Sequence, residues 1–124
     1  MILLFVRAYL SLLTWERPIA RRDFANVYRR VRDHAVTTVS PRADSCARAS
    51  RAVNLACAAY FKEVQCLQRS ATLVCLLRDL GSPAFLVLGA QHLPFSGHAW
   101  VEVNGEIVND DKLTVLKFGI LDRC

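Results

Sequence analysis

The stretch CLQRSATLVCLLRDLGSPAFLV, from Cys66 to Val87, predicts a helix followed by a strand. Gly81 can take the left-handed backbone conformation in which many helices end, and Pro83 prevents the helix from continuing. The short apolar run that follows is typical of a buried strand. We therefore expect a helix from Cys66 to Leu80 and a strand over Ala84–Gly89.

Downstream of this stretch, the run GHAWVEVNGEIVNDD predicts a hairpin. His98–Val103 and Glu106–Asp110 flank Asn104-Gly105, a dipeptide typical of tight turns between antiparallel strands. Leu113–Ile120 is a candidate for one more strand. The last third of the chain is therefore expected to form a small antiparallel sheet.

Helical patterns fill the chain before Cys66. Leu3, Val6, Leu10 and Leu13 recur at helical spacing and predict an amphipathic core helix that Pro18 interrupts. A second helix is predicted from an apolar row formed by Phe24, Val27, Tyr28, Val31 and Ala35. A third helix is predicted to begin after a cap at Asp44 or Ser45. It carries a row of small residues, Ala49, Ala52, Ala56 and Ala59.

N-terminal helices followed by a small antiparallel sheet indicate an α+β fold. A chain of 124 residues is expected to form one domain. We divide it into a helical N-terminal extension, residues 1–44, and a core, residues 45–124.

The composition is apolar and basic. Hydrophobic residues make up 53% of the chain and the mean hydropathy is +0.24, which suggests that a partner covers part of the surface. The formal net charge is +5, and much of the excess lies between Arg17 and Arg32. This basic helix can face an acidic peptide, a phosphate or an anionic membrane, or it can be an ordinary solvated helix face.

The apolar opening MILLFVRAYLSLL does not read as a secretory signal, because no basic stretch precedes it, Arg7 lies inside it and it shows no small-residue cleavage site. It is also too short to span a bilayer. We therefore expect a cytoplasmic protein without a transmembrane segment, in which the cysteines remain free thiols.

The spacing of the five cysteines argues against a structural metal site. No Cys-x-x-Cys pair is present, and zinc usually needs such close pairs. Cys66 and Cys75 are nine residues apart in one predicted helix, a rotation of about 900° that places them on opposite faces. Cys75 lies among leucine and valine and is expected to be buried and inert. Cys66 lies at the helix N-terminus, where unpaired N–H groups and the helix dipole favour the nucleophilic thiolate.

A nucleophilic thiol needs a base and a group that orients this base. His98 opens the first hairpin strand, and two adjacent aspartates lie at the end of the second. A tight two-residue turn at Asn104-Gly105 would set Asp111 opposite His98. A three-residue loop would instead place Asp110 on the face of His98. Spacing alone leans towards Asp111.

These residues match a known motif. The two quoted segments resemble the transglutaminase-like leader peptidases of bacterial lasso-peptide biosynthesis, over roughly Ser45 to Lys112. The matching positions are Cys66, Leu67, Arg69, Ser70, Leu77, Arg78, Gly81, Phe95, His98, Ala99, Trp100, Val101, Glu102, Gly105 and Asp110.

The resemblance implies a papain-like catalytic core with Cys66 as nucleophile, His98 as base and Asp110 as the orienting acid, and it implies no cofactor or metal. The expected activity is a cysteine peptidase that cleaves the leader peptide from a ribosomally made precursor through a Cys66 thioester. Choosing Asp110 requires that the hairpin is not a plain two-residue turn running unbroken to His98.

The resemblance also implies partners. The chain looks like the stand-alone form, which lacks a fused recognition domain and needs a separate leader-recognition protein beside the precursor leader peptide. The freed core would pass to a separate macrolactam-forming cyclase. We expect no nucleic-acid partner.

Three further residues are candidates for lining the site. Trp100 either walls the cleft or belongs to the core. Arg69 either contacts an acid or the leader, or it braces the helix against the sheet. The backbone N–H of Cys66 is the expected first oxyanion donor, and Gln65 is a weak candidate for the second. Two other functions stay open: a transglutaminase-like acyltransferase that uses the same triad, and a non-catalytic interaction module.

Overall fold

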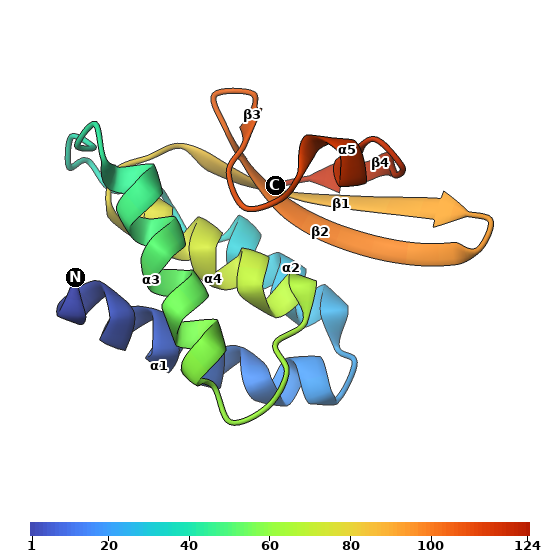
Figure 1. Cartoon of the computed structure of the whole chain (residues 1–124), viewed down its shortest axis with the longest axis horizontal. Helices are drawn as coiled ribbons and strands as arrows, with labels where there is room; N and C mark the ends of the chain where they lie inside the picture. The colour runs from blue at the N-terminus through green and yellow to red at the C-terminus, as the bar shows by residue number, and fades with distance from the viewer.

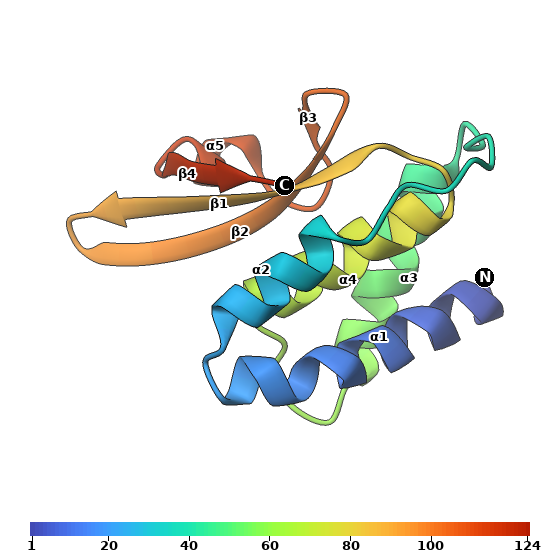
Figure 2. The same ribbon diagram turned by 180° about the vertical axis from the view of Figure 1, so that it is seen from behind.

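The computed structural model describes residues 1–124 and confirms the α+β fold. A layer of helices lies against one face of a four-stranded antiparallel sheet (Figure 1), and Figure 2 shows α1 on the side of this layer away from the sheet. None of the helices has the length and apolar character needed to cross a membrane. The elements in chain order are α1 (Ile2–Ala20), α2 (Phe24–Arg32), α3 (Ser45–Ala59), α4 (Cys66–Asp79), β1 (Ala84–His92), β2 (Phe95–Val103), β3 (Glu106–Ile107), α5 (Lys112–Val115) and β4 (Gly119–Arg123).

Helix α4 is the centre of the molecule. Its residues are buried without interruption from Ser70 to Arg78, because other helices cover it on one side and β1 and β2 on the other. The helix ends where the sequence predicts. Gly81 has a φ of +90°, and a Cβ atom there would lie 1.8 Å from the carbonyl oxygen of Val39. Only glycine fits this position, so the end of α4 is fixed by sterics.

The face that α1 buries differs from the predicted one. Leu3 and Leu10 of the predicted row are 69% and 56% exposed, and the rest of that row is also exposed. The helix is apolar around most of its circumference, so periodicity alone could not select the buried side. Pro18 does not end the helix either: α1 continues to Ala20, although the missing N–H of Pro18 deprives the Thr14 carbonyl of its partner within the helix. The buried row is Leu4, Ala8, Leu12, Trp15 and Ile19.

The predicted faces of α2 and α3 are confirmed in their centres and wrong at their ends. Phe24 begins α2 but is 47% exposed, and Ala59 ends α3 in an exposed position. Small residues let α3 approach its neighbours closely, and a helix with this packing buries little side-chain volume per residue. The confirmed buried positions are Val27 and Val31 in α2, and Ala49, Ala52 and Ala56 in α3.

The sheet has the strand order β3-β2-β1-β4, in which all pairs are antiparallel. The predicted strand Leu113–Ile120 is wrong, because α5 occupies its first half and β4 begins only at Gly119. Asp111 caps α5 by accepting a hydrogen bond from the Leu113 N–H at 3.3 Å, which turns the chain helical there. Strand β1 runs three residues beyond its predicted end, to His92.

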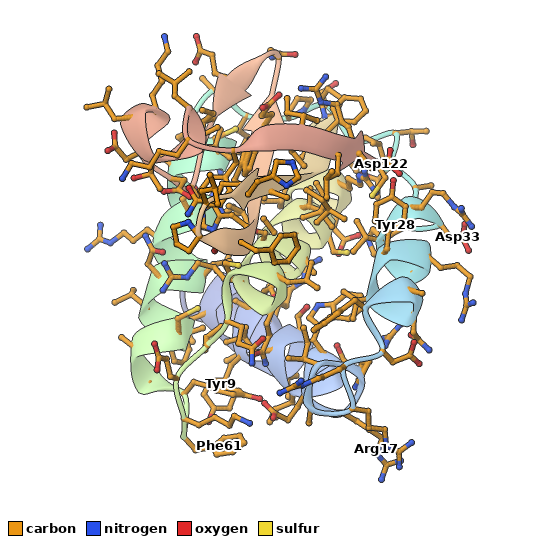
Figure 3. The ribbon with its side chains drawn as sticks, turned by 90° about the vertical axis from the view of Figure 1, so that its right-hand side faces the viewer. Tyr9, Arg17, Tyr28, Asp33, Phe61 and Asp122 are labelled. Carbon is orange, nitrogen blue, oxygen red and sulfur yellow. The ribbon has the colours of Figure 1, made fainter.

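The second edge of the sheet is tied to the helix layer. Figure 3 shows Tyr28 of α2 beside Asp122 of β4. Burial and the neighbouring Asp122 carboxylate raise the pKa of the Tyr28 hydroxyl, so the proton stays on the phenol. Strand β4 also pairs with β1 next to Leu86, whose N–H donates to the Cys124 carbonyl at 2.7 Å.

Candidate active site

Cys66 is the first residue of α4 and its side chain is exposed. Gln65 precedes it in extended conformation, and the Arg69 N–H donates to the Gln65 carbonyl at 3.0 Å as the helix begins. The N–H groups of the first turn have no acceptor within the helix and are free to bind an oxyanion. A thiol at this position therefore lies beside ready-made donors.

His98 and Asp110 are in direct contact. The Nε2 atom of His98 is hydrogen-bonded to Oδ2 of Asp110, and the two side chains are only 21% and 20% exposed. The other carboxylate oxygen of Asp110 accepts from the Asp111 N–H at 2.7 Å. The ring of His98 stacks on Phe118, with centroids 5.0 Å apart. These contacts fix the imidazole on one side and leave Nδ1 as its unengaged nitrogen.

Cys66 and His98 line the same two adjoining cavities. One has a volume of about 330 Å³ and is mostly apolar, with Phe24, Leu67 and Leu121 in its wall. The other has about 210 Å³ and is polar. The thiol and the imidazole thus lie where an apolar and a polar hollow meet. This arrangement suits a bound peptide, because the apolar hollow can bury one of its side chains and the polar hollow can form hydrogen bonds with its main chain. The polar hollow also contains Val64, Arg69, Ser70, Ala99, Asn109 and Asp110.

The hairpin turn is the tight form, and the ladder breaks before it reaches His98. Val103 pairs with Glu106 across Asn104-Gly105, whose φ angles are +52° and +79°. The three-residue loop is therefore absent, but the ladder does not run unbroken to His98, as the choice of Asp110 requires. Because a plain ladder would have set Asp111 opposite His98, the contact with Asp110 needs a departure from the ladder after β3.

Asn109 causes this departure. The Val108 N–H still donates to the Val101 carbonyl at 3.0 Å, as the ladder requires. In a regular antiparallel ladder the Val101 N–H would donate to the Val108 carbonyl. Here it donates to the side-chain oxygen of Asn109, at 2.8 Å. The Val108 carbonyl faces Ser50 instead, at 3.4 Å. A side chain thus replaces a main-chain acceptor, and the segment that follows turns towards His98.

Ser70 connects this turn to the helix of Cys66. Its hydroxyl is buried, donates to the Ala99 carbonyl at 3.1 Å and accepts from the Asn109 amide at 3.0 Å. Our sequence reasoning assigned no role to Ser70 or Asn109. The available signal was positional: Ser70 follows Cys66 by one helical turn, and Asn109 directly precedes Asp110.

The remaining candidates have separate places. Trp100 is fully buried on the face of the sheet away from α4 and lines neither cavity. The centroids of its ring and of the His98 ring are 5.9 Å apart. The Trp100 indole N–H donates to Glu102 at 2.9 Å. Arg69 lines the polar cavity and makes no ion pair within the chain, whereas Gln65 lines the apolar one. Asp111 is exposed and caps α5.

Cys75 is buried on the far side of α4, as predicted. It is 8% exposed, and burial raises the pKa of its thiol to about 12. The thiol therefore stays protonated at neutral pH and cannot act as a nucleophile. None of the five cysteines forms a disulfide.

Comparison with known proteins agrees with this architecture. The family model described as the transglutaminase-like superfamily matches residues 6–122, nearly the whole chain. A curated relative, the microcin J25-processing protein McjB of Escherichia coli, is 41% identical over 56 residues, which cover 41% of this chain and 27% of that protein. The aligned part thus spans about a quarter of the length of that relative. No solved structure matches the chain.

Proposed function

The chain belongs to the transglutaminase-like superfamily, and from this we propose that it is a cysteine peptidase that removes the leader peptide from a lasso-peptide precursor. The observation that carries the proposal is the contact of His98 Nε2 with Asp110, on a histidine that shares both its cavities with Cys66. The similarity to a microcin-processing protein supports a precursor peptide as the substrate.

The proposed reaction has two steps. Cys66 Sγ attacks the carbonyl carbon of the last leader residue, and His98 receives the thiol proton. His98 passes this proton to the departing amine of the first core residue, so that the C–N bond breaks and a thioester remains. Water then attacks the thioester while its proton moves to His98. The leader leaves as a carboxylic acid and Cys66 regains its proton.

Other groups of the site have supporting roles in this proposal. Asp110 orients the imidazole and stabilises the imidazolium that forms. The Cys66 N–H, at the start of α4, donates to the oxyanion, and Gln65, which lines the apolar cavity with Cys66, is the candidate for a second donor. The unpaired Arg69 lies in the polar cavity, where its guanidinium can bind carbonyl or carboxylate groups of the precursor.

We also propose that a separate leader-recognition protein docks on the exposed apolar row of α1. Val6 and Leu10 line a hollow of about 230 Å³ together with Phe5 and Tyr9. Exposed leucines and isoleucines at one helix face are costly in water unless a partner covers them. The proposal places the reaction in the cytoplasm, upstream of a macrolactam-forming cyclase.

The test is incubation of the protein with precursor peptide, with and without the recognition protein, followed by mass spectrometry. Hydrolysis gives two fragments, whose summed mass exceeds that of the precursor by one water. An acyltransferase would instead give an adduct with an added amine. Cys66→Ala should give neither product, and unchanged cleavage by this variant would refute the proposal. Intact precursor with the native protein under every condition would indicate a non-catalytic interaction module.

A further inference from the structure

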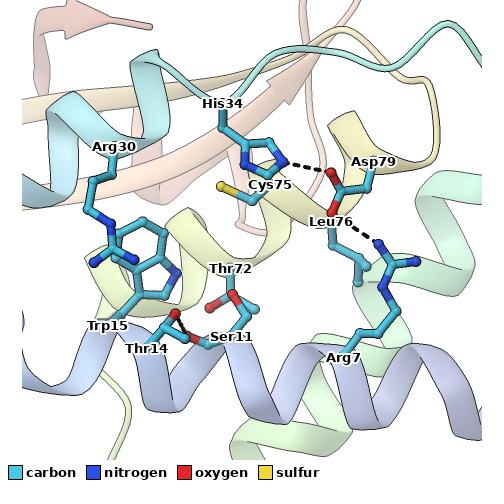
Figure 4. A pocket seen from close by; sticks show the side chains of 10 residues that line it. All are labelled: Arg7, Ser11, Thr14, Trp15, Arg30, His34, Thr72, Cys75, Leu76 and Asp79. Carbon is cyan, nitrogen blue, oxygen red and sulfur yellow. Dashed lines mark hydrogen bonds and ion pairs between the residues drawn. The ribbon is translucent and has the colours of Figure 1, made fainter.

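A second polar cavity lies on the opposite side of α4 from Cys66. Its volume is about 250 Å³, and it lies between α1, the end of α2 and α4 (Figure 4). It shares no residue with the two cavities of the candidate active site. The proposed peptidase reaction therefore leaves its chemistry unexplained.

Two buried polar atoms in the wall of this cavity have no hydrogen-bond partner within the protein. They are Nε1 of Trp15 and Oγ1 of Thr72, in residues that are 4% and 0% exposed. Buried donors are almost always satisfied, since leaving one unpaired costs the full desolvation of the group. Two such groups in one cavity indicate a ligand with acceptor atoms.

The charges in the cavity favour an anion. Both oxygens of Asp79 are occupied, one by His34 Nε2 at 2.6 Å and the other by Arg7 at 3.0 Å. The carboxylate therefore has little capacity to bind a cation. Arg30 stacks over the Trp15 ring, 4.4 Å from its centroid, and makes no ion pair within the chain. Stacking engages the flat face of the guanidinium and leaves the N–H groups at its edge free to donate.

A hollow next to the cavity is also basic. It shares Thr14 and Arg30 with the cavity and adds Arg17 and Arg21, against a single acid, Asp23. Such an excess of guanidinium groups beside the cavity raises the local concentration of anions.

We propose that this cavity binds a carboxylate, held by the Trp15 indole N–H, the Thr72 hydroxyl and the Arg30 guanidinium. Three donors match the two acceptor oxygens of one carboxylate. A phosphate dianion fits less well, because only one guanidinium is unengaged and the negative Asp79 lines the same cavity. The carboxylate belongs either to a small free acid or to an acidic side chain of a protein partner.

The two tryptophans make the proposal testable without any assay of activity. In ¹⁵N-labelled full-length protein each gives one indole N–H resonance, and Trp100, which is bonded to Glu102, serves as an internal control. Sodium acetate, N-acetylglutamate amide and sodium phosphate are titrated at matched ionic strength, with sodium chloride as the reference. We expect acetate to shift the Trp15 resonance to saturation and to leave Trp100 unmoved.

Variants distinguish binding by these three donors from a general attraction of anions to the basic surface. Arg30→Gln should weaken acetate binding about tenfold or more, the loss expected for one charge-assisted hydrogen bond. Thr72→Val keeps the side-chain shape and should also weaken binding. Arg51→Gln, an exposed arginine on α3, should change nothing. Tighter binding of N-acetylglutamate amide than of acetate would assign the site to an acidic side chain, and the reverse order to a small free acid.

Three results would overturn the proposal. The first is the absence of a saturating shift of Trp15 with either carboxylate. The second is an affinity in Arg30→Gln equal to that of the native protein. The third, tighter binding of phosphate than of both carboxylates, would refute the assignment to a carboxylate.

Discussion

The side-chain amide of Asn109 donates a hydrogen bond to the hydroxyl of Ser70 at 3.0 Å, and this contact joins the helix that begins with Cys66 to the segment that carries Asp110. The same hydroxyl donates to the Ala99 carbonyl, next to His98. One buried oxygen therefore connects the three elements on which the proposed triad stands. We infer that Ser70 and Asn109 are positioning residues, which set the distance between nucleophile, base and acid.

The first prediction follows from this connection. Ser70→Ala should lower kcat for leader removal by about 10²-fold, the effect typical of an ångström-scale misplacement of reacting groups, with little change in KM. Ser70→Thr, which keeps a hydroxyl, should recover much of the loss. Ser50→Ala removes only the weaker 3.4 Å contact with the Val108 carbonyl and is the matched control. If kcat falls equally in Ser50→Ala and Ser70→Ala, the positioning role of Ser70 is wrong.

The second prediction concerns the two adjacent aspartates. Asp110→Asn should reduce kcat by about 10³–10⁴-fold, because a neutral amide stabilises the imidazolium less than a carboxylate does and can turn its NH₂ group towards Nε2, which favours the unproductive tautomer. Asp111→Asn should be mild, since asparagine also caps helices and Asp111 contacts only the start of α5. Rate measurements on both variants check this. A larger loss in Asp111→Asn would reverse the assignment.

The third prediction separates Cys66 from Cys75. Cys66→Ala should abolish cleavage and leave the unfolding free energy nearly unchanged, because the side chain is exposed. Cys75→Ala should keep most activity and lower the unfolding free energy by about 1–2 kcal/mol, as for other modest core truncations. Iodoacetamide labelling at pH 8 with peptide mapping should modify Cys66 and spare Cys75. Loss of activity in both variants, with both folded, would contradict this division of roles.

How much of this site the sequence predicts depends on the residue. The end of α4 follows from Gly81 and Pro83, because glycine readily takes the left-handed conformation in which many helices end and proline cannot continue a helix. The contact of His98 with Asp110 does not, since turn chemistry favours the tight turn that the structure has and this turn points to Asp111. The deciding interaction is the Asn109 side chain on the Val101 N–H. A side-chain bond of this kind leaves no periodic trace in the sequence.

The face of α1 shows a second limit of prediction. Hydrophobic periodicity identifies a helix but cannot rank two apolar faces, and α1 has both. Which one is buried depends on the complementary shapes of α3 and α4, which are set by residues far along the chain. The cavity between Trp15 and Thr72 likewise cannot be predicted from the sequence, because its wall forms only when three helices pack together.

The fourth prediction concerns alkaline pH. The pKa of Cys75 is raised from 9.0 to about 12 in the folded protein. Above pH 9 the unfolded chain releases this proton and the folded chain retains it, so stability is full below pH 9 and falls as pH rises towards 12. One such group contributes a slope of up to about 1.4 kcal/mol per pH unit.

Urea unfolding between pH 7 and pH 10.5 measures this slope. Other groups with raised pKa values, Tyr60 among them, contribute in the same direction, so the informative quantity is the difference between proteins. Cys75→Ala should lose stability less steeply above pH 9 than the native chain. Parallel curves for the native chain and Cys75→Ala would show that this thiol does not resist ionisation.

The last prediction concerns the apolar row of α1. Leu3 and Leu10 are 69% and 56% exposed, so replacing both with serine removes little buried surface and should change the unfolding free energy by less than about 1 kcal/mol. If a leader-recognition protein docks there, the double variant Leu3→Ser/Leu10→Ser should lose most of the acceleration that this partner gives, while cleavage by the chain alone stays the same. The control pair is Leu113→Ser/Leu116→Ser, at positions that are both 71% exposed on the other side of the sheet. Rates at trace precursor, measured over a series of partner concentrations, distinguish weaker docking from slower chemistry, because weaker docking shifts the midpoint of the series and slower chemistry lowers its plateau. A midpoint that moves only in the control pair would place the docking surface on α5 instead of α1.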